Sequence, residues 1–188
     1  TGSLTRGEVE LADACDIEGR PSPAVMRLAV INARLETGIV NPLDAAIVTA
    51  GKAAGIVTDE VAKLDEIPYD FIRRRLTVAV RGEDGSVLVI SKGAVASILA
   101  CCTTIDRGDG PRPLTDERRG AINLWCAEKG REGLRVLAVA VRALPGKTTL
   151  ARDDERDMTL AGLLLFRDPP KDGIVETIAA LKRLGIAI

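Results

Sequence analysis

The sequence that decides the fold reads DEIPYDFIRRRLTVAV from Asp65 to Val80 and continues as RGEDGSVLVISKGA from Arg81 to Ala94. The β-branched and apolar run that follows the three arginines predicts a strand, and Ser86 to Ile90 predict a second one. Glu83-Asp84-Gly85 lies between them and is typical of a tight turn. The stretch therefore predicts a β-hairpin around which the remaining elements are arranged.

The two mouths of this hairpin carry chemistry that suits a nucleotide. Tyr69 and Phe71 lie at one mouth, although the whole chain has only one Tyr, two Phe and one Trp. An aromatic face can stack a base, arginine and lysine can bind phosphates, and Gly93 beside Lys92 would let the backbone approach a ligand. The pattern indicates a nucleotide pocket, but two ordinary core aromatics remain an open alternative at this point.

Length and charge set limits on the class of protein. With 188 residues the chain can bury a core as one domain with short appendages. The net charge of −1 gives no general attraction to nucleic acid or to anionic lipid. No apolar stretch is long enough to span a bilayer, and the first ten residues are polar, so we expect a soluble piece without a signal peptide.

The cysteines and the lack of histidine exclude some kinds of site. The four cysteines show no Cys-x-x-Cys spacing and the chain has no histidine, which argues against a zinc site. We expect the cysteines to be small buried hydrophobes in a reducing compartment. Without histidine, the commonest general base is also missing.

Local signals place helices around the hairpin. Three helix starts are predicted, at Ser22-Pro23, Asn41-Pro42 and Thr115. Ser, Asn and Thr are favoured N-caps, and a proline directly after the cap is favoured at the first helical position. Thr58 to Glu60 suggest a further short helix, and residues 174–184 a last one. Strands joined by hairpins favour an antiparallel sheet covered by helices, so the predicted fold class is α+β or mixed α/β.

Four motifs resemble those of P-type cation-transporting ATPases, and they occur in the order typical of that family. They are Thr1-Gly2-Ser3-Leu4-Thr5, Ser91-Lys92-Gly93-Ala94, Leu134-Arg135-Val136-Leu137-Ala138 and Asp168-Pro169-Pro170-Lys171. The first resembles the end of the phosphorylation signature, with Ser3 where Thr is usual. Ile67 to Arg75 and Asn41 to Ile47 are similar to the bacterial magnesium-transporting subclass, with Tyr69 in place of the more usual Phe.

The resemblance implies a nucleotide-binding domain at residues 6–167, with remnants of the α/β phosphorylation domain at 1–5 and 168–188. It implies a cytoplasmic, ATP-binding part of a bacterial inner- or plasma-membrane protein that transports Mg²⁺. The aspartate that forms the aspartyl-phosphate would lie before Thr1, so this piece alone should be inactive. The partners implied are ATP, with Mg²⁺, and the phosphorylation, actuator and transmembrane domains of the same protein, without nucleic acid.

The resemblance also implies the residues that hold the base. Tyr69 would stack on the adenine, and Phe71 would line or support that pocket. Lys92 would lie at the far side of the purine and toward the phosphates, with Gly93 allowing close approach. Asp44 would accept a hydrogen bond from the adenine amine, although an acid in the first turn of a helix also simply favours the helix dipole.

Other residues are implied on the phosphate side. Ser91 belongs to the same motif as Lys92, and Arg74 and Arg135 would contact phosphates or ribose. Thr1 and Asp168 would lie on the catalytic side, near the absent aspartate and its Mg²⁺, and no metal site is expected within the domain itself. Strand alternation would turn Arg73 and Arg75 to the side opposite Arg74, where we expect them to be solvated.

Three alternatives stay open from the sequence. The chain could be the nucleotide domain of another P-type cation pump, for Ca²⁺ or H⁺. It could be a non-catalytic interaction module whose arginines bind an acidic partner. A self-sufficient phosphatase or kinase of the haloacid-dehalogenase type is disfavoured, because neither Asp153-Asp154 nor Asp168 presents an Asp-x-Asp-like motif at a clear strand end.

Overall fold

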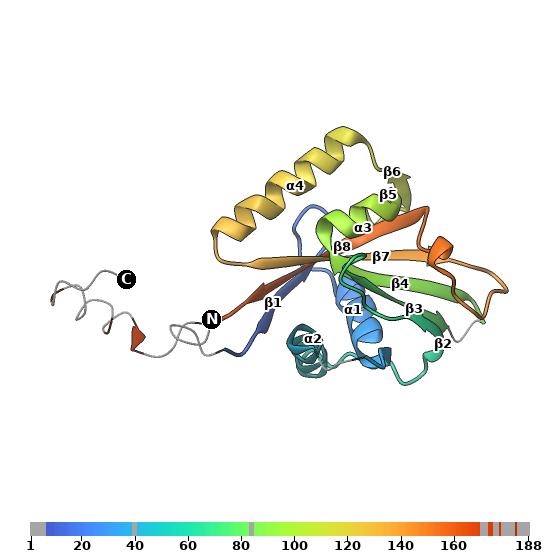
Figure 1. Cartoon of the computed structure of the whole chain (residues 1–188), viewed down its shortest axis with the longest axis horizontal. Coiled ribbons are helices and arrows are strands. Elements are labelled where there is room, and N and C mark those ends of the chain that lie inside the picture. The colour runs from blue at the N-terminus through green and yellow to red at the C-terminus, as the bar shows by residue number, and fades with distance from the viewer. Residues whose placement is uncertain are drawn as a thin grey trace.

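The computed structural model describes residues 7–38, 41–82 and 85–169, and also residues 173, 174, 177 and 183. Within these residues an eight-stranded sheet lies between helices (Figure 1). The strands are β1 (Glu10–Cys15), β2 (Ala62–Ile67), β3 (Arg75–Arg81), β4 (Val87–Ala94), β5 (Cys102–Asp106), β6 (Pro111–Pro113), β7 (Arg135–Ala143) and β8 (Met158–Arg167). The helices are α1 (Pro23–Leu35), α2 (Pro42–Ala53), α3 (Val95–Cys101), α4 (Asp116–Arg131) and the 3₁₀ turn η1 (Arg152–Asp154).

The sheet is antiparallel except at one position. Its order is β2-β3-β4-β7-β8-β5-β6, and β1 also pairs with β8. The predicted hairpin forms with Arg75 opposite Gly93 and Arg81 opposite Val87. The pair β5–β8 is the one parallel ladder among the described strands. The predicted α+β fold with an antiparallel sheet is therefore confirmed, with this single parallel addition.

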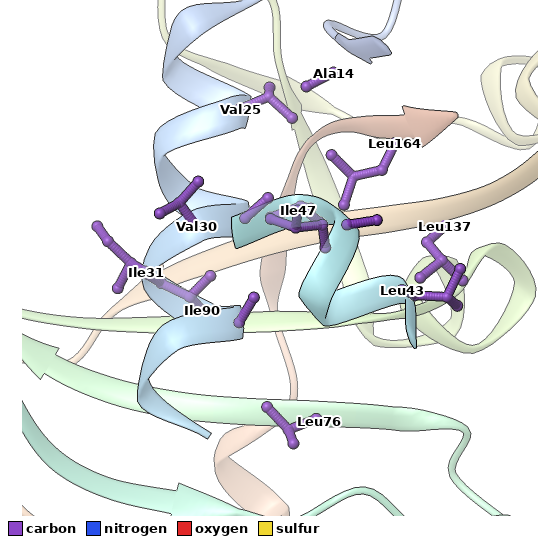
Figure 2. Packing of buried hydrophobic residues seen from close by; sticks show 14 of the residues in the cluster. Ala14, Val25, Val30, Ile31, Leu43, Ile47, Leu76, Ile90, Leu137 and Leu164 are labelled. Atoms are coloured by element: carbon purple, nitrogen blue, oxygen red, sulfur yellow. The ribbon is translucent and has the colours of Figure 1, made fainter. Parts of the chain in front are cut away.

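The helices cover both faces of the sheet. In Figure 1, α1 and α2 lie on one face and α3 and α4 on the other. Each face of the sheet has its own hydrophobic core, and alternate residues of β8 belong to one or the other. Leu164 and Phe166 pack against α1 and α2, whereas Leu163 and Leu165 pack on the α3 side. Figure 2 shows the first core, where side chains of α1 and α2 point onto the strands. A sheet buried on both faces explains why its central strands read as continuous apolar runs.

Three predicted helix starts are confirmed by their caps. The side chain of Ser22 accepts a hydrogen bond from the N–H of Val25, that of Asn41 from Leu43, and that of Thr115 from Arg118. These caps satisfy N–H groups that have no partner within the helix. They fix where α1, α2 and α4 begin.

Other local predictions were wrong or cannot be compared. Residues 58–60 lie in a turn that leads into the strand β2, where a short helix was expected, and β2 was not predicted because three of its six residues are charged. The turn residues 83–84 and most of the helix predicted at 174–184 lie outside the described residues.

The chain enters and leaves the sheet through neighbouring strands. Glu10, the first residue of β1, lies opposite Arg167, the last residue of β8, and the two side chains form an ion pair at 3.0 Å. The N–H of Gly7 donates to Asp168 Oδ1 at 3.2 Å, which extends this contact beyond the strands. Both connections of the domain are therefore gathered at one end of the sheet. Among the described residues, no helix combines the length and the apolar character that crossing a membrane would need.

Candidate functional site

A cavity of about 670 Å³ opens on the sheet face that carries α1 and α2, because its lining includes Leu43, Leu76 and Leu137 of the core on that side. Its lining comes from the α1–α2 connection, the first turn of α2, the segment before β3, and the ends of β4 and β7. Seven of the eight residues implied as an ATP site line it: Asp44, Tyr69, Phe71, Arg74, Lys92, Gly93 and Arg135. The fold thus brings together residues that are spread over some ninety positions of the sequence.

The floor of the cavity combines a buried ion pair with apolar side chains. The Asn41 cap and Pro42 start α2 so that Asp44 lies in its first turn, and the carboxylate accepts a hydrogen bond from Lys92 Nζ of β4. Both side chains are almost fully buried, at 7% and 4% exposure. Leu76 and Leu137 add apolar surface from β3 and β7. Asp44 therefore does more than favour the helix dipole, because it neutralises a buried lysine.

The mouth of the cavity carries two exposed aromatic rings. Tyr69 is 48% exposed and Phe71 is 89% exposed. The rings pack edge to face, with centroids 5.7 Å apart and planes at 89°. They are not core residues, so the alternative of two ordinary core aromatics is excluded. Large apolar rings kept in water beside a cavity are suited to stacking a planar ligand.

Gly93 is required by the protein chain itself. A Cβ at this position would lie 2.4 Å from the carbonyl oxygen of Arg74 and 2.6 Å from Cβ of Arg75. Arg74 has a left-handed backbone (φ 49°), and its carbonyl accepts a hydrogen bond from the N–H of Ala94 at 3.0 Å. Gly93 therefore lets the turn before β3 press against β4, and this turn directs Arg74 into the cavity.

Arg74 and Arg135 supply positive charge without a partner. Both line the cavity and both are exposed. In the described part of the chain, neither guanidinium has an ion pair or a hydrogen bond. Arg135 lies opposite Phe166 of β8, one residue before Arg167, so its side of the cavity lies at the end of the sheet where the chain enters and leaves. Two uncompensated guanidinium groups at one rim can bind an anion.

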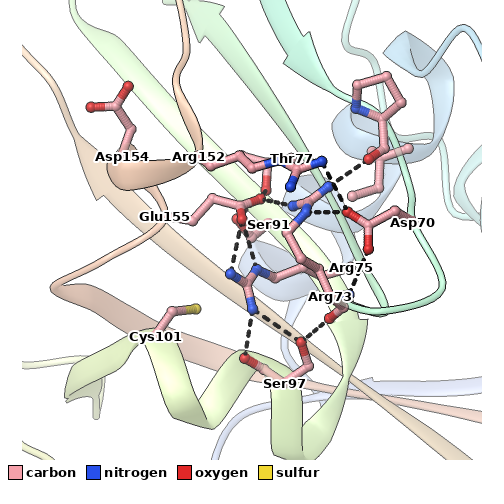
Figure 3. Close-up of polar contacts among 12 residues, drawn as sticks. Asp70, Arg73, Arg75, Thr77, Ser91, Ser97, Cys101, Arg152, Asp154 and Glu155 are labelled. Atoms are coloured by element: carbon pink, nitrogen blue, oxygen red, sulfur yellow. Dashed lines mark hydrogen bonds and ion pairs between the residues drawn. The ribbon is translucent and has the colours of Figure 1, made fainter.

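Arg73 and Arg75 have a different role from the one expected. Figure 3 shows both pointing toward Glu155, whose side chain is completely buried. Arg73 Nη1 lies 2.5 Å from Glu155 Oε1, and Arg75 Nη2 lies 2.9 Å from Oε2. The expectation that these two arginines are solvated was wrong, because Glu155 comes from a segment eighty residues away that packs behind the hairpin.

Further hydrogen bonds extend this buried cluster. Arg73 also binds Asp70 and donates to the carbonyl of Pro68 at 2.6 Å. Arg75 Nη1 donates to Ser97 Oγ at 3.1 Å, and the Thr77 hydroxyl donates to Glu155. Burial alone would lower the pKa of Arg73, but its hydrogen bonds to Glu155 and Asp70 raise that pKa above its ordinary value. The cluster therefore holds the 68–75 segment from behind, while Tyr69 and Arg74 face the cavity.

Ser91 is the one implied site residue that does not line the cavity. It is fully buried, and its hydroxyl lies 2.6 Å from that of Thr77, beside Glu155. Adjacent residues of a strand point to opposite faces of a sheet. Since Lys92 points into the cavity, Ser91 points away from it.

One carboxyl group of the cavity was missed by the sequence analysis. Glu36 directly follows the last residue of α1 and lines the cavity near Asp44. Burial, the charge of Asp44 and a hydrogen bond to Asp44 raise the pKa of Glu36 to about 7, against the attraction of Lys92. No motif marks an acid at this position, so only the arrangement in space identifies it.

The residues implied on the catalytic side lie elsewhere. Asp168 follows β8 and accepts from Gly7, away from the cavity lining. Thr1 lies outside the described residues. The expected burial of the cysteines is confirmed for Cys15, Cys101 and Cys102, while Cys126 is half-buried and all four are free thiols. Burial raises the pKa of Cys15 to about 12, so it stays a neutral thiol.

Comparison with known proteins agrees with this geometry. Residues 31–173 match the family described as "P-type ATPase, cytoplasmic domain N". The whole chain is 36% identical over 191 residues to proteins named "Magnesium-transporting ATPase, P-type 1" from Salmonella typhimurium and from Escherichia coli K12, and covers 21% of each. A "Calcium-transporting ATPase" of Bacillus subtilis is 26% identical over 151 residues, which are 78% of this chain and 17% of that protein.

The chain thus spans about a fifth of the length of the curated relatives that it matches. The matched family region runs from within α1 to beyond β8 and includes every described residue that lines the cavity. The chain therefore belongs to the P-type ATPases and contains their cytoplasmic domain N.

Proposed function

We propose that this chain binds ATP in the 670 Å³ cavity, as the nucleotide-binding domain of a P-type ATPase that transports Mg²⁺. The observation that carries the proposal is the combination at one cavity of two exposed aromatic rings and two unpaired arginines. A base can stack on Tyr69, and phosphates can bind Arg74 and Arg135. The seven lining residues named above form the proposed site, and Ser91 supports it from the opposite face.

The arginines also argue against a plain anion-binding module. Of the three consecutive arginines only Arg74 lacks an acidic partner, because Arg73 and Arg75 are both paired with Glu155. A patch that binds acidic partners through general charge would need several free cations. Two free arginines, Arg74 and Arg135, beside a pair of exposed aromatic rings suit one nucleotide better.

The position of Arg135 suggests the direction of the phosphates. Its rim of the cavity lies at the end of the sheet where β1 and β8 connect the domain to the rest of the chain. Phosphates bound there would point toward a neighbouring domain that carries the nucleophile. Phosphoryl transfer requires in-line positioning and charge neutralisation. Weak binding of ATP suffices to position it, since a dissociation constant of about 1 mM corresponds to a binding free energy of only about −4 kcal/mol.

The identity of the transported ion rests on relatives. Proteins named as magnesium-transporting match the whole chain at 36% identity, whereas a calcium-transporting relative matches 78% of it at 26%.

We propose that the domain occupies residues 6–167 of a bacterial membrane protein. Its partners would be the phosphorylation, actuator and transmembrane domains of that protein. Among the described residues no cluster of three or more acids or cysteines could hold a metal ion, so we propose that Mg²⁺ arrives with the phosphates of ATP.

The test is an NMR titration of the 188-residue chain with ATP, GTP and AMP. We expect ATP to shift resonances of residues 67–76 and 91–94. Tyr69→Ala should weaken ATP binding about tenfold or more, because a stacked base contributes about 1–3 kcal/mol. Arg135→Ala should weaken ATP binding but leave AMP nearly unchanged if this residue binds the outer phosphates. Arg131→Ala, an exposed arginine of α4 that does not line the cavity, is the matched control and should change neither.

The anion-module alternative predicts a different pattern. ATP and GTP would then shift the arginine resonances alike, and Tyr69→Ala would leave the affinity for ATP unchanged. Binding would also fall steeply with added salt and show no base preference. That pattern would refute the proposed nucleotide site.

A further inference from the structure

Glu36 is the one titratable group of the cavity to which the proposed ATP site gives no task. It caps the C-terminal end of α1 with an extended backbone (φ −65°, ψ 146°), and its side chain joins the lining beside Asp44. Glu36 and Asp44 line the same ligand-sized cavity, and Asp44 adds a negative charge close to Glu36. A partly buried carboxyl beside a second acid favours its protonated form, and from such an arrangement proton-dependent recognition follows.

The charged groups around Glu36 favour its protonated form. Asp44 of α2 is paired with Lys92 of β4, so its negative charge is already compensated. Glu66 of β2 also faces Glu36, but Glu66 is bound by Lys63 and by the hydroxyl of Thr37. In the described part of the structure Glu36 has no cation of its own. The pKa of Glu36 is therefore raised to about 7, chiefly by burial and then by Asp44, so Glu36 is mostly protonated at pH 6 and mostly ionised at pH 8.

The protonated acid and the ionised carboxylate recognise different bases. A protonated carboxyl offers one donor and one acceptor side by side, as does the edge of adenine formed by N1 and the 6-amino group. An ionised carboxylate offers acceptors only, which suit the two adjacent donors on the N1 and 2-amino edge of guanine and repel adenine N1. Because Lys92 already satisfies Asp44, the Glu36 proton can turn toward a ring nitrogen without leaving Asp44 unpaired.

We propose that Glu36 is a base-recognition residue of this cavity, which in its protonated form pairs with the N1/6-amino edge of adenine and so couples ATP binding to the uptake of a proton. This inference rests on the proposed ATP-binding function and adds the atoms that select the base. It predicts that adenine preference is a property of the neutral acid and is lost when Glu36 ionises.

The decisive variant is Glu36→Gln. A glutamine amide offers one donor side and one acceptor side at every pH, as the neutral acid does, but it cannot ionise. The matched control is Glu128→Gln, the same change on α4, at an exposed residue that does not line the cavity. Affinities for ATP and GTP are measured at pH 6 and pH 8 by NMR titration of the 188-residue chain. Comparing each variant with wild type at the same pH cancels the titration of the phosphates themselves.

We expect ATP affinity of wild type and of Glu128→Gln to fall about tenfold relative to Glu36→Gln between pH 6 and pH 8. This follows because the protonated fraction of a group with a pKa of about 7 falls from roughly 0.9 to roughly 0.1 over that range. GTP affinity should not fall with it. The side-chain carboxyl carbon of Glu36 should titrate near neutral pH in the free protein, and at higher pH with ATP bound.

Three results would overturn the inference. Wild type and Glu36→Gln could lose ATP affinity in parallel, or GTP could weaken with pH as much as ATP does. The carboxyl carbon of Glu36 could also titrate near its ordinary value of 4.5. In each case ATP would still bind, so the proposed nucleotide site would survive. A complete lack of ATP binding at both pH values would instead overturn the proposed function, and this inference with it.

Discussion

Replacing Glu155 by glutamine tests how the cavity is held in shape. Glu155 has no exposed side-chain surface, and its two arginine partners are only 11% and 16% exposed. Gln is nearly the same size, but one of its two polar atoms becomes an N–H donor that faces another donor. The change therefore removes the compensating charge from Arg73 and Arg75 without opening a void.

The expected loss is about 3 kcal/mol of the free energy of unfolding. Removing one partner from a buried ion pair typically costs about 3–5 kcal/mol, because the remaining charge is left uncompensated. The lower end applies here, since Arg73 keeps Asp70 and Arg75 keeps Ser97. For a chain of this length the loss corresponds to a fall in Tm of roughly 6–12 °C. ATP affinity should fall as well, because the turn that presents Tyr69 is no longer held from behind.

The assay is urea unfolding of wild type and variant, followed by circular dichroism and by the fluorescence of Trp125, the single tryptophan. The control is Glu132→Gln, which breaks the exposed pair with Lys129 and should cost less than about 0.5 kcal/mol. Equal slopes against urea are needed to compare free energies. A loss below about 1 kcal/mol for Glu155→Gln would refute the reasoning that this carboxylate anchors the arginine turn.

Three further predictions concern the cavity itself. Folding raises the pKa of Glu36 from 4.5 to about 7, so Glu36 takes up a proton on folding and the free energy of unfolding falls as pH rises through that range. In urea titrations at pH 8, the free energy of unfolding of Glu36→Gln should exceed that of wild type by about 1–2 kcal/mol, after allowance for the partial exposure of Glu36. Below pH 5 the two proteins should be equally stable. Gly93→Ala should cost about 3 kcal/mol in the same assay because its Cβ meets backbone atoms, whereas Gly130→Ala, with no neighbour within 4 Å, should be neutral or stabilising. Arg74→Ala should weaken ATP binding about tenfold with an unchanged urea midpoint, and an equal loss in Arg131→Ala would contradict this.

Much of the fold could be predicted because its signals are local. The caps Ser22, Asn41 and Thr115 lie within three residues of the N–H groups that they bind, and the β3–β4 hairpin joins neighbouring segments. The strand β2 was missed because its charged residues lie at a sheet edge, where one side faces water. The parallel pair β5–β8 joins segments about fifty residues apart, and nothing in either segment indicates the other.

The candidate site divides in the same way. The aromatic and lysine segments lie in one hairpin and were found together, whereas Glu155 approaches from the far part of the chain. The prediction for Arg73 and Arg75 assumed regular strand alternation and solvent on their side, but Arg74 has a left-handed backbone and a buried acid lies there. Alternation applied to β4 would have shown that Ser91 and Lys92 cannot both face the cavity.

The paired ends of β1 and β8 determine how the domain responds to mechanical load. Any force transmitted through its two connections acts at Glu10 and Arg167, which face each other at the same end of one antiparallel ladder. Such a force separates the strands from that end, so the interstrand hydrogen bonds break one after another rather than all at once. The ladder therefore resists pulling weakly: the Gly7–Asp168 hydrogen bond would break first, then the Glu10–Arg167 ion pair, long before the sheet interior is strained. Pulling at the opposite ends of β3 and β4 would instead have to shear a whole ladder.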